Sequence, residues 1–142
     1  MADIFHLDND VFRSYLACGT VIIVKMMALS LFTTYRRFKY KAFSNPEDTK
    51  RPVTKHEDVE RVRRLHRNDL ENIPVFLALG CMYIATEPVP STAIWHFRVF
   101  AISRILHSIS YLAGIQPWRV LVYSVGFLVN ASMAYHILCA AL

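Results

Sequence analysis

The feature that most constrains this chain is residues 60–80, ERVRRLHRNDLENIPVFLALG, where a dense group of charges passes directly into an apolar run. No Asp, Glu, Lys or Arg occurs from residue 72 to residue 86. This pattern predicts a helix that starts in water and ends in hydrocarbon. Charges at such a boundary are costly, so they mark a functional site by default. The polar residues at the predicted boundary are Arg64, Arg67, Asn68 and Glu71.

Four stretches of the chain are candidates to cross a bilayer: residues 11–35, 72–87, 91–113 and 118–142. Because a span needs about 20 residues, the second stretch is long enough only if its helix extends back to about Glu57. Pro88 and Gly114 are among the breakers that separate the later stretches. The sequence therefore predicts an all-α membrane protein, with residues 1–142 forming a single domain built as a four-transmembrane-helix bundle.

The positive charge is concentrated in residues 36–67, which hold eleven of the sixteen Lys and Arg residues against five Asp and Glu residues. A basic segment between apolar spans is typical of the cytosolic face of a membrane protein, and less so of a nucleic-acid-binding domain. We therefore expect the loop 36–67 to be cytosolic and expect no nucleic-acid partner. The turn between the third and fourth helices should return to the same face.

The three cysteines, Cys18, Cys81 and Cys139, lie far apart in apolar runs and show no metal-ligand spacing. We interpret them as buried or lipid-facing thiols and expect no metal site. The first ten residues lack the basic segment and cleavage site of a secretory signal peptide, so no cleaved signal is expected.

Three sets of polar residues recur at helical spacing near the predicted cytosolic boundary. Taken helix by helix, they are Arg61, Arg64, Asn68 and Glu71; Arg104, His107 and Tyr111; and Arg119 and Tyr123. If the three sets converge, they form a cationic pocket with a single carboxylate. Such a pocket suits a polar anionic ligand from the cytosol, and its lipid side would admit a hydrophobic second substrate.

Simpler interpretations exist for part of this set. Interfacial arginines such as Arg98 often reach to lipid headgroups, and a pair such as Arg67 and Glu71 is common on helix surfaces. Arg104 and His107 are different because they lie a turn or more inside a predicted span, where an unpaired charge is expensive. We interpret these two as pocket residues.

Four segments carry a resemblance to a known family. They are ERVRRLHRNDLENIPVFLALG, PSTAIWHFRVFAISRILHSISYL, PWRVLVYSVGF and ASMAYHIL. Together they resemble the MAPEG family of small membrane proteins of eicosanoid and glutathione metabolism. The resemblance runs from about Val24 to the end of the chain, and its helix-two motif, ERxRRxHxNDxENI, is long and specific.

The resemblance implies a homotrimer of four-helix subunits in the endoplasmic reticulum membrane, with the mitochondrial outer membrane as an alternative location. Glutathione would bind between neighbouring subunits. Arg119 would be the catalytic residue, because its guanidinium would stabilise the glutathione thiolate. The residues that would bind glutathione are Arg37, Arg67, Asn68, Glu71, Arg104, His107, Tyr111 and Tyr123. Of these, Arg37 is supplied by the resemblance alone.

The function implied is that of a membrane-bound glutathione transferase acting on hydrophobic electrophiles, with glutathione peroxidase activity toward lipid hydroperoxides. One alternative is an isomerase of the prostaglandin E synthase type that uses the same thiolate. Val120 speaks against it, since those synthases carry a serine directly after the activating arginine. A second alternative is a non-catalytic scaffold that binds membrane lipid or a partner.

Overall fold

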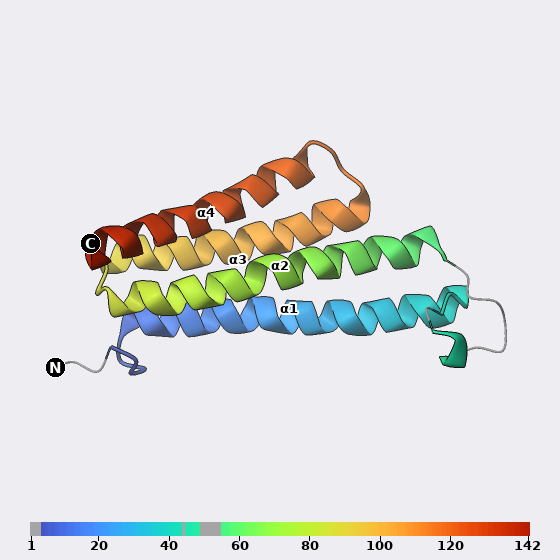
Figure 1. The fold of residues 1–142 in the computed structure, drawn as a ribbon, viewed down its shortest axis with the longest axis horizontal. Helices are drawn as coiled ribbons and strands as arrows, with labels where there is room; N and C mark the ends of the chain where they lie inside the picture. Colours follow the sequence, from blue (N-terminus) through green and yellow to red (C-terminus); the bar gives the residue numbers. More distant parts are fainter. Residues whose placement is uncertain (1–3, 44, 49–54) are drawn as a thin grey trace.

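The computed structural model describes residues 4–43, 45–48 and 55–142. This part of the chain holds four α-helices and one short 3-10 helix. In order they are α1 (Asp10–Tyr40), η1 (Pro46–Asp48), α2 (Glu57–Ala85), α3 (Pro90–Ala113) and α4 (Trp118–Ala141). The helices run side by side in alternating directions (Figure 1). The predicted all-α class is therefore confirmed.

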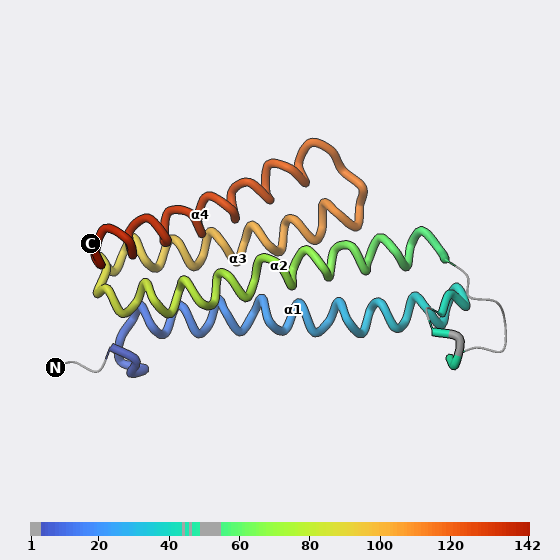
Figure 2. The backbone as a smooth tube through the Cα atoms, viewed as in Figure 1, coloured from blue at the N-terminus to red at the C-terminus, as the bar shows by residue number. Residues whose placement is uncertain are grey.

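The two ends of the bundle differ in what they carry. Both chain ends and the α2–α3 turn lie at one end, while the α1–α2 connection and the α3–α4 turn lie at the other (Figures 1 and 2). This arrangement brings the α3–α4 turn to the end that carries the basic segment, as the sequence predicts. We refer to this as the basic end of the bundle.

Helix α1 is longer than the expected stretch 11–35, whereas α2 begins at Glu57, where its start was expected. Helix α1 continues to Tyr40, where Lys41 adopts a left-handed conformation (φ 53°) and its amide closes on the carbonyls of Arg37 and Phe38. Helix α2 begins at Glu57 because the side chain of His56 accepts a hydrogen bond from the Asp58 amide. Within the connection, residues 44 and 49–54 lie outside the described residues.

The core is built from large side chains that pack between α1, α2 and α3. Phe76 of α2 stacks on Phe100 of α3 with ring centroids 4.0 Å apart, and Phe97 packs against both Phe76 and Tyr15 of α1. Gly80 allows this close approach, since a Cβ atom there would lie 2.6 Å from the Tyr15 ring. The central three helices are therefore fixed by direct ring packing.

Helix α4 buries fewer of its residues than the other three helices. Its buried residues are Gly126, Asn130 and Met133, and most of its other apolar side chains are exposed. Toward the α3–α4 turn it draws away from α3 (Figure 1). Among the described residues, α1 and α4 are long and apolar enough to cross a membrane. Two of the four expected membrane spans are thus supported by their length and composition.

Candidate functional site

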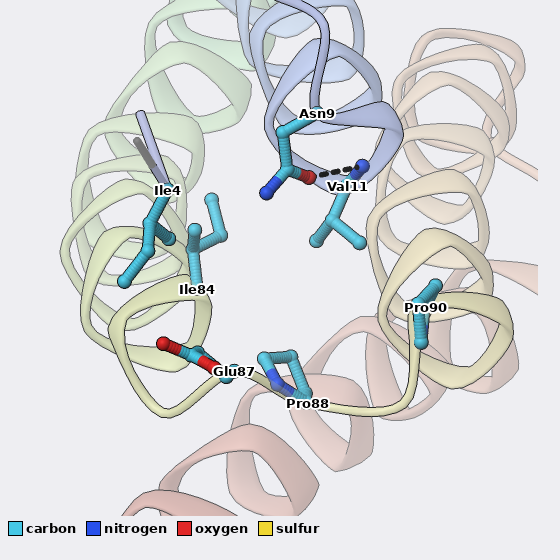
Figure 3. A pocket seen from close by; sticks show the side chains of 7 residues that line it. All are labelled: Ile4, Asn9, Val11, Ile84, Glu87, Pro88 and Pro90. Carbon is cyan, nitrogen blue, oxygen red and sulfur yellow. Dashed lines mark hydrogen bonds between the residues drawn. The ribbon is translucent and has the colours of Figure 1, made fainter. Parts of the chain in front are cut away.

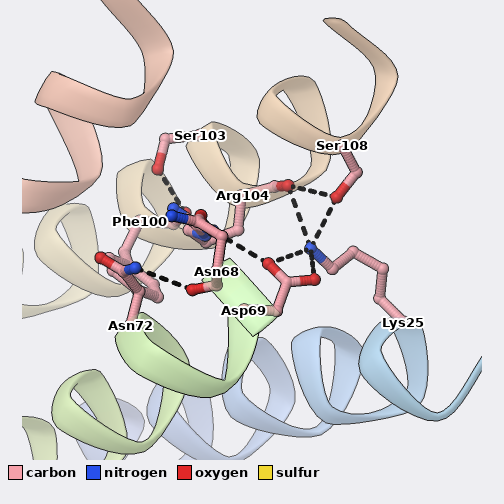
Figure 4. Close-up of polar contacts among 8 residues, drawn as sticks. All are labelled: Lys25, Asn68, Asp69, Asn72, Phe100, Ser103, Arg104 and Ser108. Atoms are coloured by element: carbon pink, nitrogen blue, oxygen red, sulfur yellow. Dashed lines mark hydrogen bonds and ion pairs between the residues drawn. The ribbon is translucent and has the colours of Figure 1, made fainter. Parts of the chain in front are cut away.

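A buried ionic cluster joins three helices near the middle of the bundle (Figure 4). Asp69 of α2 is fully buried, and its carboxylate lies 2.8 Å from the Nζ atom of Lys25 on α1 and 2.9 Å from Nη2 of Arg104 on α3. Lys25 also donates to the Arg104 carbonyl and to the Ser108 hydroxyl, at 3.1 and 2.8 Å. Three helices are therefore held together by one carboxylate between two cations.

Arg104 has a second partner in this cluster. Its Nη2 atom also donates to the side-chain oxygen of Asn68, the residue before Asp69. This contact fixes the orientation of the Asn68 amide. The Arg104 side chain is 1% exposed, so its guanidinium contacts Asn68 and Asp69 and does not reach the protein surface. Its geometry is that of a positioning residue for Asn68.

Lys25 and Asp69 are not among the residues predicted for the site, although the sequence contains a signal for both. Asp69 interrupts a stripe of buried residues on α2 formed by Val62, Leu65, Ile73 and Phe76. An acidic residue at a core position of an apolar stripe must be paired. The sequence offers Lys25 as its partner, since Lys25 is the only charge in the first apolar stretch apart from Arg13 at the start of that stretch.

A second cluster lies at the basic end, near the α3–α4 turn. The ring of His107 lies 5.7 Å from that of Tyr111 and 6.1 Å from that of Tyr123, measured between centroids. The Cζ atom of Arg119 lies 4.9 Å from the centre of the Tyr111 ring. The structure thus brings together four of the five predicted residues of α3 and α4; the fifth, Arg104, lies in the ionic cluster.

Within the described residues, some polar groups of this second cluster lack a hydrogen-bond or ion-pair partner. When the Gln116 amide is oriented with its oxygen toward Arg119, that oxygen accepts hydrogen bonds from the Arg119 guanidinium. No carboxylate pairs with Arg119 in the described part of the chain. His107 is buried, and its Nδ1 atom has no hydrogen-bond partner. An unpaired cation therefore lies in the same cluster as an unsatisfied buried imidazole, which leaves capacity for a polar ligand.

Arg64 connects this cluster to α2. Its guanidinium donates to the Glu57 carboxylate at 2.6 Å and also interacts with the Tyr111 side chain. These two contacts, Glu57 first, raise the pKa of Arg64 above its ordinary value. Arg64 is therefore engaged on its own chain and holds Tyr111 in place.

The remaining predicted residues lie apart from the second cluster. Arg37 and Arg67 line a polar cavity of about 280 Å³ between α1 and α2, together with Arg63 and His66. Glu71 is exposed and has no ion pair or hydrogen bond within the described residues. One copy of the chain therefore does not gather all the predicted residues around a single point.

The far end of the bundle carries a different cavity, which none of the predicted residues lines. It measures about 500 Å³ and lies between the N-terminal segment and the α2–α3 turn (Figure 3). Its lining residues are Ile4, Asn9, Val11, Ile84, Glu87, Pro88 and Pro90. The described residues contain no group of three or more His, Cys, Asp or Glu side chains that could hold a metal ion.

Comparison with known proteins agrees with the resemblance seen in the sequence. A family model described as the MAPEG family matches residues 15–139. The chain is 45% identical to microsomal glutathione S-transferase 1 of mouse (Mus musculus), over 97% of this chain and 96% of that protein. It is 44% identical to the human (Homo sapiens) protein of the same name, over 93% and 92%. It is 42% identical to prostaglandin E synthase of horse (Equus caballus), over 90% and 88%.

Proposed function

The chain belongs to the MAPEG family, and on that premise we propose that it is a membrane-bound glutathione transferase that joins the sulfur of glutathione to hydrophobic electrophiles. Relatives named microsomal glutathione S-transferase 1 match nearly the whole chain. The structural observation that carries the proposal is the Arg119 guanidinium, which lies over the Tyr111 ring and has no carboxylate partner in the described chain.

The residues present fit the chemistry of glutathione, which has two carboxylates, one ammonium group and one thiol. Arg37 and Arg67 supply cations for the carboxylates, and the exposed carboxylate of Glu71 is free to accept the ammonium group. The orphaned Nδ1 atom of buried His107 offers one further polar contact. These residues are proposed contacts, together with Asn68, Tyr111 and Tyr123. We assign Arg104 to the same site through its hydrogen bond with Asn68.

The proposed mechanism rests on the state of the thiol. A free thiol has a pKa of about 8.5, so the thiolate is a minor species at neutral pH. A guanidinium stays charged at any working pH and can donate several hydrogen bonds, so Arg119 near the sulfur favours the thiolate. The thiolate then forms a bond to an electrophilic carbon, and the leaving group, such as chloride, departs with the electron pair of its broken bond. The thiol proton passes to solvent.

The same thiolate supports a peroxidase reaction with lipid hydroperoxides, which is part of the proposal. Sulfur attacks the distal peroxide oxygen, the O–O bond breaks, and the lipid alkoxide takes a proton from solvent, which gives the lipid alcohol and glutathione sulfenic acid. The thiol of a second glutathione attacks the sulfenic sulfur, the S–O bond breaks, and water leaves as glutathione disulfide forms. Both reactions benefit from a site that meets a water-soluble thiol on one side and a bilayer-dissolved substrate on the other, because proximity removes much of the entropic barrier.

We propose further that the protein works as a homotrimer with four spans per copy and with glutathione bound between neighbouring copies. Two observations support this. Arg37 and Arg67 line a cavity apart from the Arg119 cluster, and a second copy could bring the two sets together. Helix α4 also exposes an apolar surface that its own chain does not cover, including Trp118, Val120, Leu121, Phe127 and Leu128.

The proposed location is the endoplasmic reticulum membrane, with the basic end of the bundle in the cytosol. Residues 36–67 would then face the compartment that supplies glutathione. The mitochondrial outer membrane is the alternative location. Appending an N-glycosylation acceptor to the exposed C-terminal residue Leu142 tests the orientation, since our proposal puts this end in the lumen, where the acceptor becomes glycosylated.

The central experiment replaces Arg119 by leucine in the purified protein. Because the loss of one donor from a charge-stabilising site typically costs about 100-fold to 1,000-fold in rate, we expect conjugation of 1-chloro-2,4-dinitrobenzene to fall by about that factor while glutathione still binds. Stopped-flow absorbance of the thiolate should fall in parallel. Arg36→Leu, which removes an arginine paired with Asp58, is the matched control and should keep near wild-type turnover. Unchanged turnover in Arg119→Leu refutes the assignment.

Mixing two inactive variants tests whether the site is shared between copies. If Arg37 and Arg119 come from different copies, coexpressed Arg37→Ala and Arg119→Leu chains form some intact sites and regain activity. If both come from one copy, no mixed assembly contains an intact site and activity stays lost. Feeding a prostaglandin endoperoxide and looking for a keto-alcohol product separates the transferase from the isomerase.

A further inference from the structure

A groove on the outer side of α1 and α3, at the end of the bundle that carries both termini, has no part in the proposed glutathione chemistry. It has a volume of about 450 Å³. Its lining residues are Asp10, Arg13, Ser14, Ala17, Cys18, Ile94 and Arg98. The groove therefore combines two guanidinium groups with the small side chains of Ser14, Ala17 and Cys18.

The charge in this groove is not balanced. Arg13 is paired with Asp10 on the helix surface. Arg98 is exposed, and no ion pair or hydrogen bond to it occurs in the part of the chain that the structure describes. Two cations against one carboxylate leave one net positive charge.

The depth of Arg98 makes this charge informative. Arg98 lies eight residues after Pro90, which is about 12 Å along α3. Helices α1 and α3 both start at this end of the bundle (Figure 1), and side chains on a helix lean toward its N-terminus. Arg98 and Arg13 therefore both reach back toward the membrane surface. A cation at this depth has to meet an anion or water, and it marks a binding site by default.

An apolar row continues from the charged groove along α1. A second groove shares Arg13 and Ala17 with the first. Its other lining residues are Leu16, Thr20, Val21 and Val24. From residue 13 to residue 24 the row spans about 16 Å, which matches about 15 Å for the hydrocarbon of one leaflet, half of a bilayer core.

From this shape and charge we propose that the two grooves bind one anionic glycerophospholipid. Arg98 and Arg13 hold its phosphodiester, and one acyl chain lies along the row from Leu16 to Val24. Guanidinium groups bind phosphate oxygens in a bidentate manner, and a lipid with one net negative charge neutralises the groove. A zwitterionic lipid brings its own cation next to these arginines and is disfavoured.

Lipid titration of the purified protein tests the proposal. The probes are dioleoylphosphatidylglycerol and dioleoylphosphatidylcholine, and native mass spectrometry measures the bound fraction. We expect the anionic lipid to bind about tenfold tighter than the zwitterionic one, because both carry the phosphodiester but only the zwitterionic lipid places an ammonium group near the two arginines. Arg98→Gln should remove this preference, and Arg98→Lys should restore most of it. Lys39→Gln, which removes an exposed cation at the basic end, is the control and should leave the preference unchanged.

Two further results decide between lipid and a second copy of the chain. A phosphatidylglycerol with a photoreactive acyl chain should label residues 16–24 of the wild-type protein and not of Arg98→Gln. Equal lipid preference in wild type and Arg98→Gln overturns the proposal. So does efficient disulfide cross-linking between copies that carry Leu16→Cys, because the groove is then covered by protein. Arg98 is exposed, so the thermal midpoint of Arg98→Gln without added lipid should equal that of the wild type.

Discussion

The buried carboxylate of Asp69 gives the most direct test of what holds the helices together. The side chain of Asp69 has no exposed surface, and its two cationic partners are 16% (Lys25) and 1% (Arg104) exposed. Asp69→Asn keeps the volume and removes the charge, so two cations remain in the core without a counter-charge. Breaking a buried ion pair by removing one partner costs about 3–5 kcal/mol. Because Lys25 is partly exposed and can recruit water, we expect a loss near the lower value.

The assay is the free energy of unfolding in detergent micelles, measured by denaturant titration. Asp8→Asn is the matched control, since the Asp8 side chain is 93% exposed, and it should change stability by no more than about 0.5 kcal/mol. The triple variant Lys25→Met, Asp69→Leu and Arg104→Met should recover most of the stability, because well-packed apolar groups can replace a buried ion cluster. If Asp69→Asn is as stable as the control, the cluster does not hold the bundle and the reasoning fails.

Three further predictions concern packing and pH. Gly80→Ala places a Cβ atom 2.6 Å from the Tyr15 ring and should lower stability by about 1–3 kcal/mol, measured by thermal unfolding; an unchanged midpoint would show that the ring can move. Tyr15→Phe removes the hydrogen bond of 2.8 Å from its hydroxyl to the Leu77 carbonyl and should cost about 1 kcal/mol in the same assay, whereas a gain in stability would contradict that bond. The pKa of Asp58 is lowered, chiefly by a hydrogen bond with Tyr40. Asp58 therefore stabilises the fold above its ordinary pKa of about 3.9, and this stabilisation is lost as the pH falls through the lowered pKa. Asp58→Asn should therefore weaken the loss of unfolding free energy at and below about pH 4, and an acid limb identical to wild type would exclude this role.

The number and order of the helices could be predicted from the sequence because apolar length and breakers decide them. Pro88 and Gly114 end their helices where the pattern required. The end of α1 could not be predicted, because Lys41 takes the left-handed conformation that a glycine would have signalled. The charged residues on either side of this connection are all compatible with a helix, so local composition gave no stopping point.

The candidate site was predictable where helical spacing alone brings residues together. His107 and Tyr111 are four positions apart on one face of α3, and their rings come within 5.7 Å. The role of Arg104 was harder to predict, because its contacts depend on which residue faces it from another helix. Arg104 donates to the predicted Asn68 and to its neighbour Asp69, and only the packing of α2 on α3 decides that Asp69 is the buried one of the two.

The order in which the ionic cluster occurs along the chain has a consequence for biogenesis. Lys25 is followed by Asp69 after 44 positions, and Arg104 comes 35 positions later. A lysine at the centre of an isolated span costs about 2.5–3.5 kcal/mol on insertion, so α1 is apolar enough to span a membrane but carries one uncompensated charge when it inserts by itself. If α2 and α3 also span, as we propose, α2 brings Asp69 to Lys25 and makes the α1–α2 hairpin neutral at this level, and α3 then adds Arg104 next to the Asp69 carboxylate. The first two helices should therefore leave the translocation machinery as a pair.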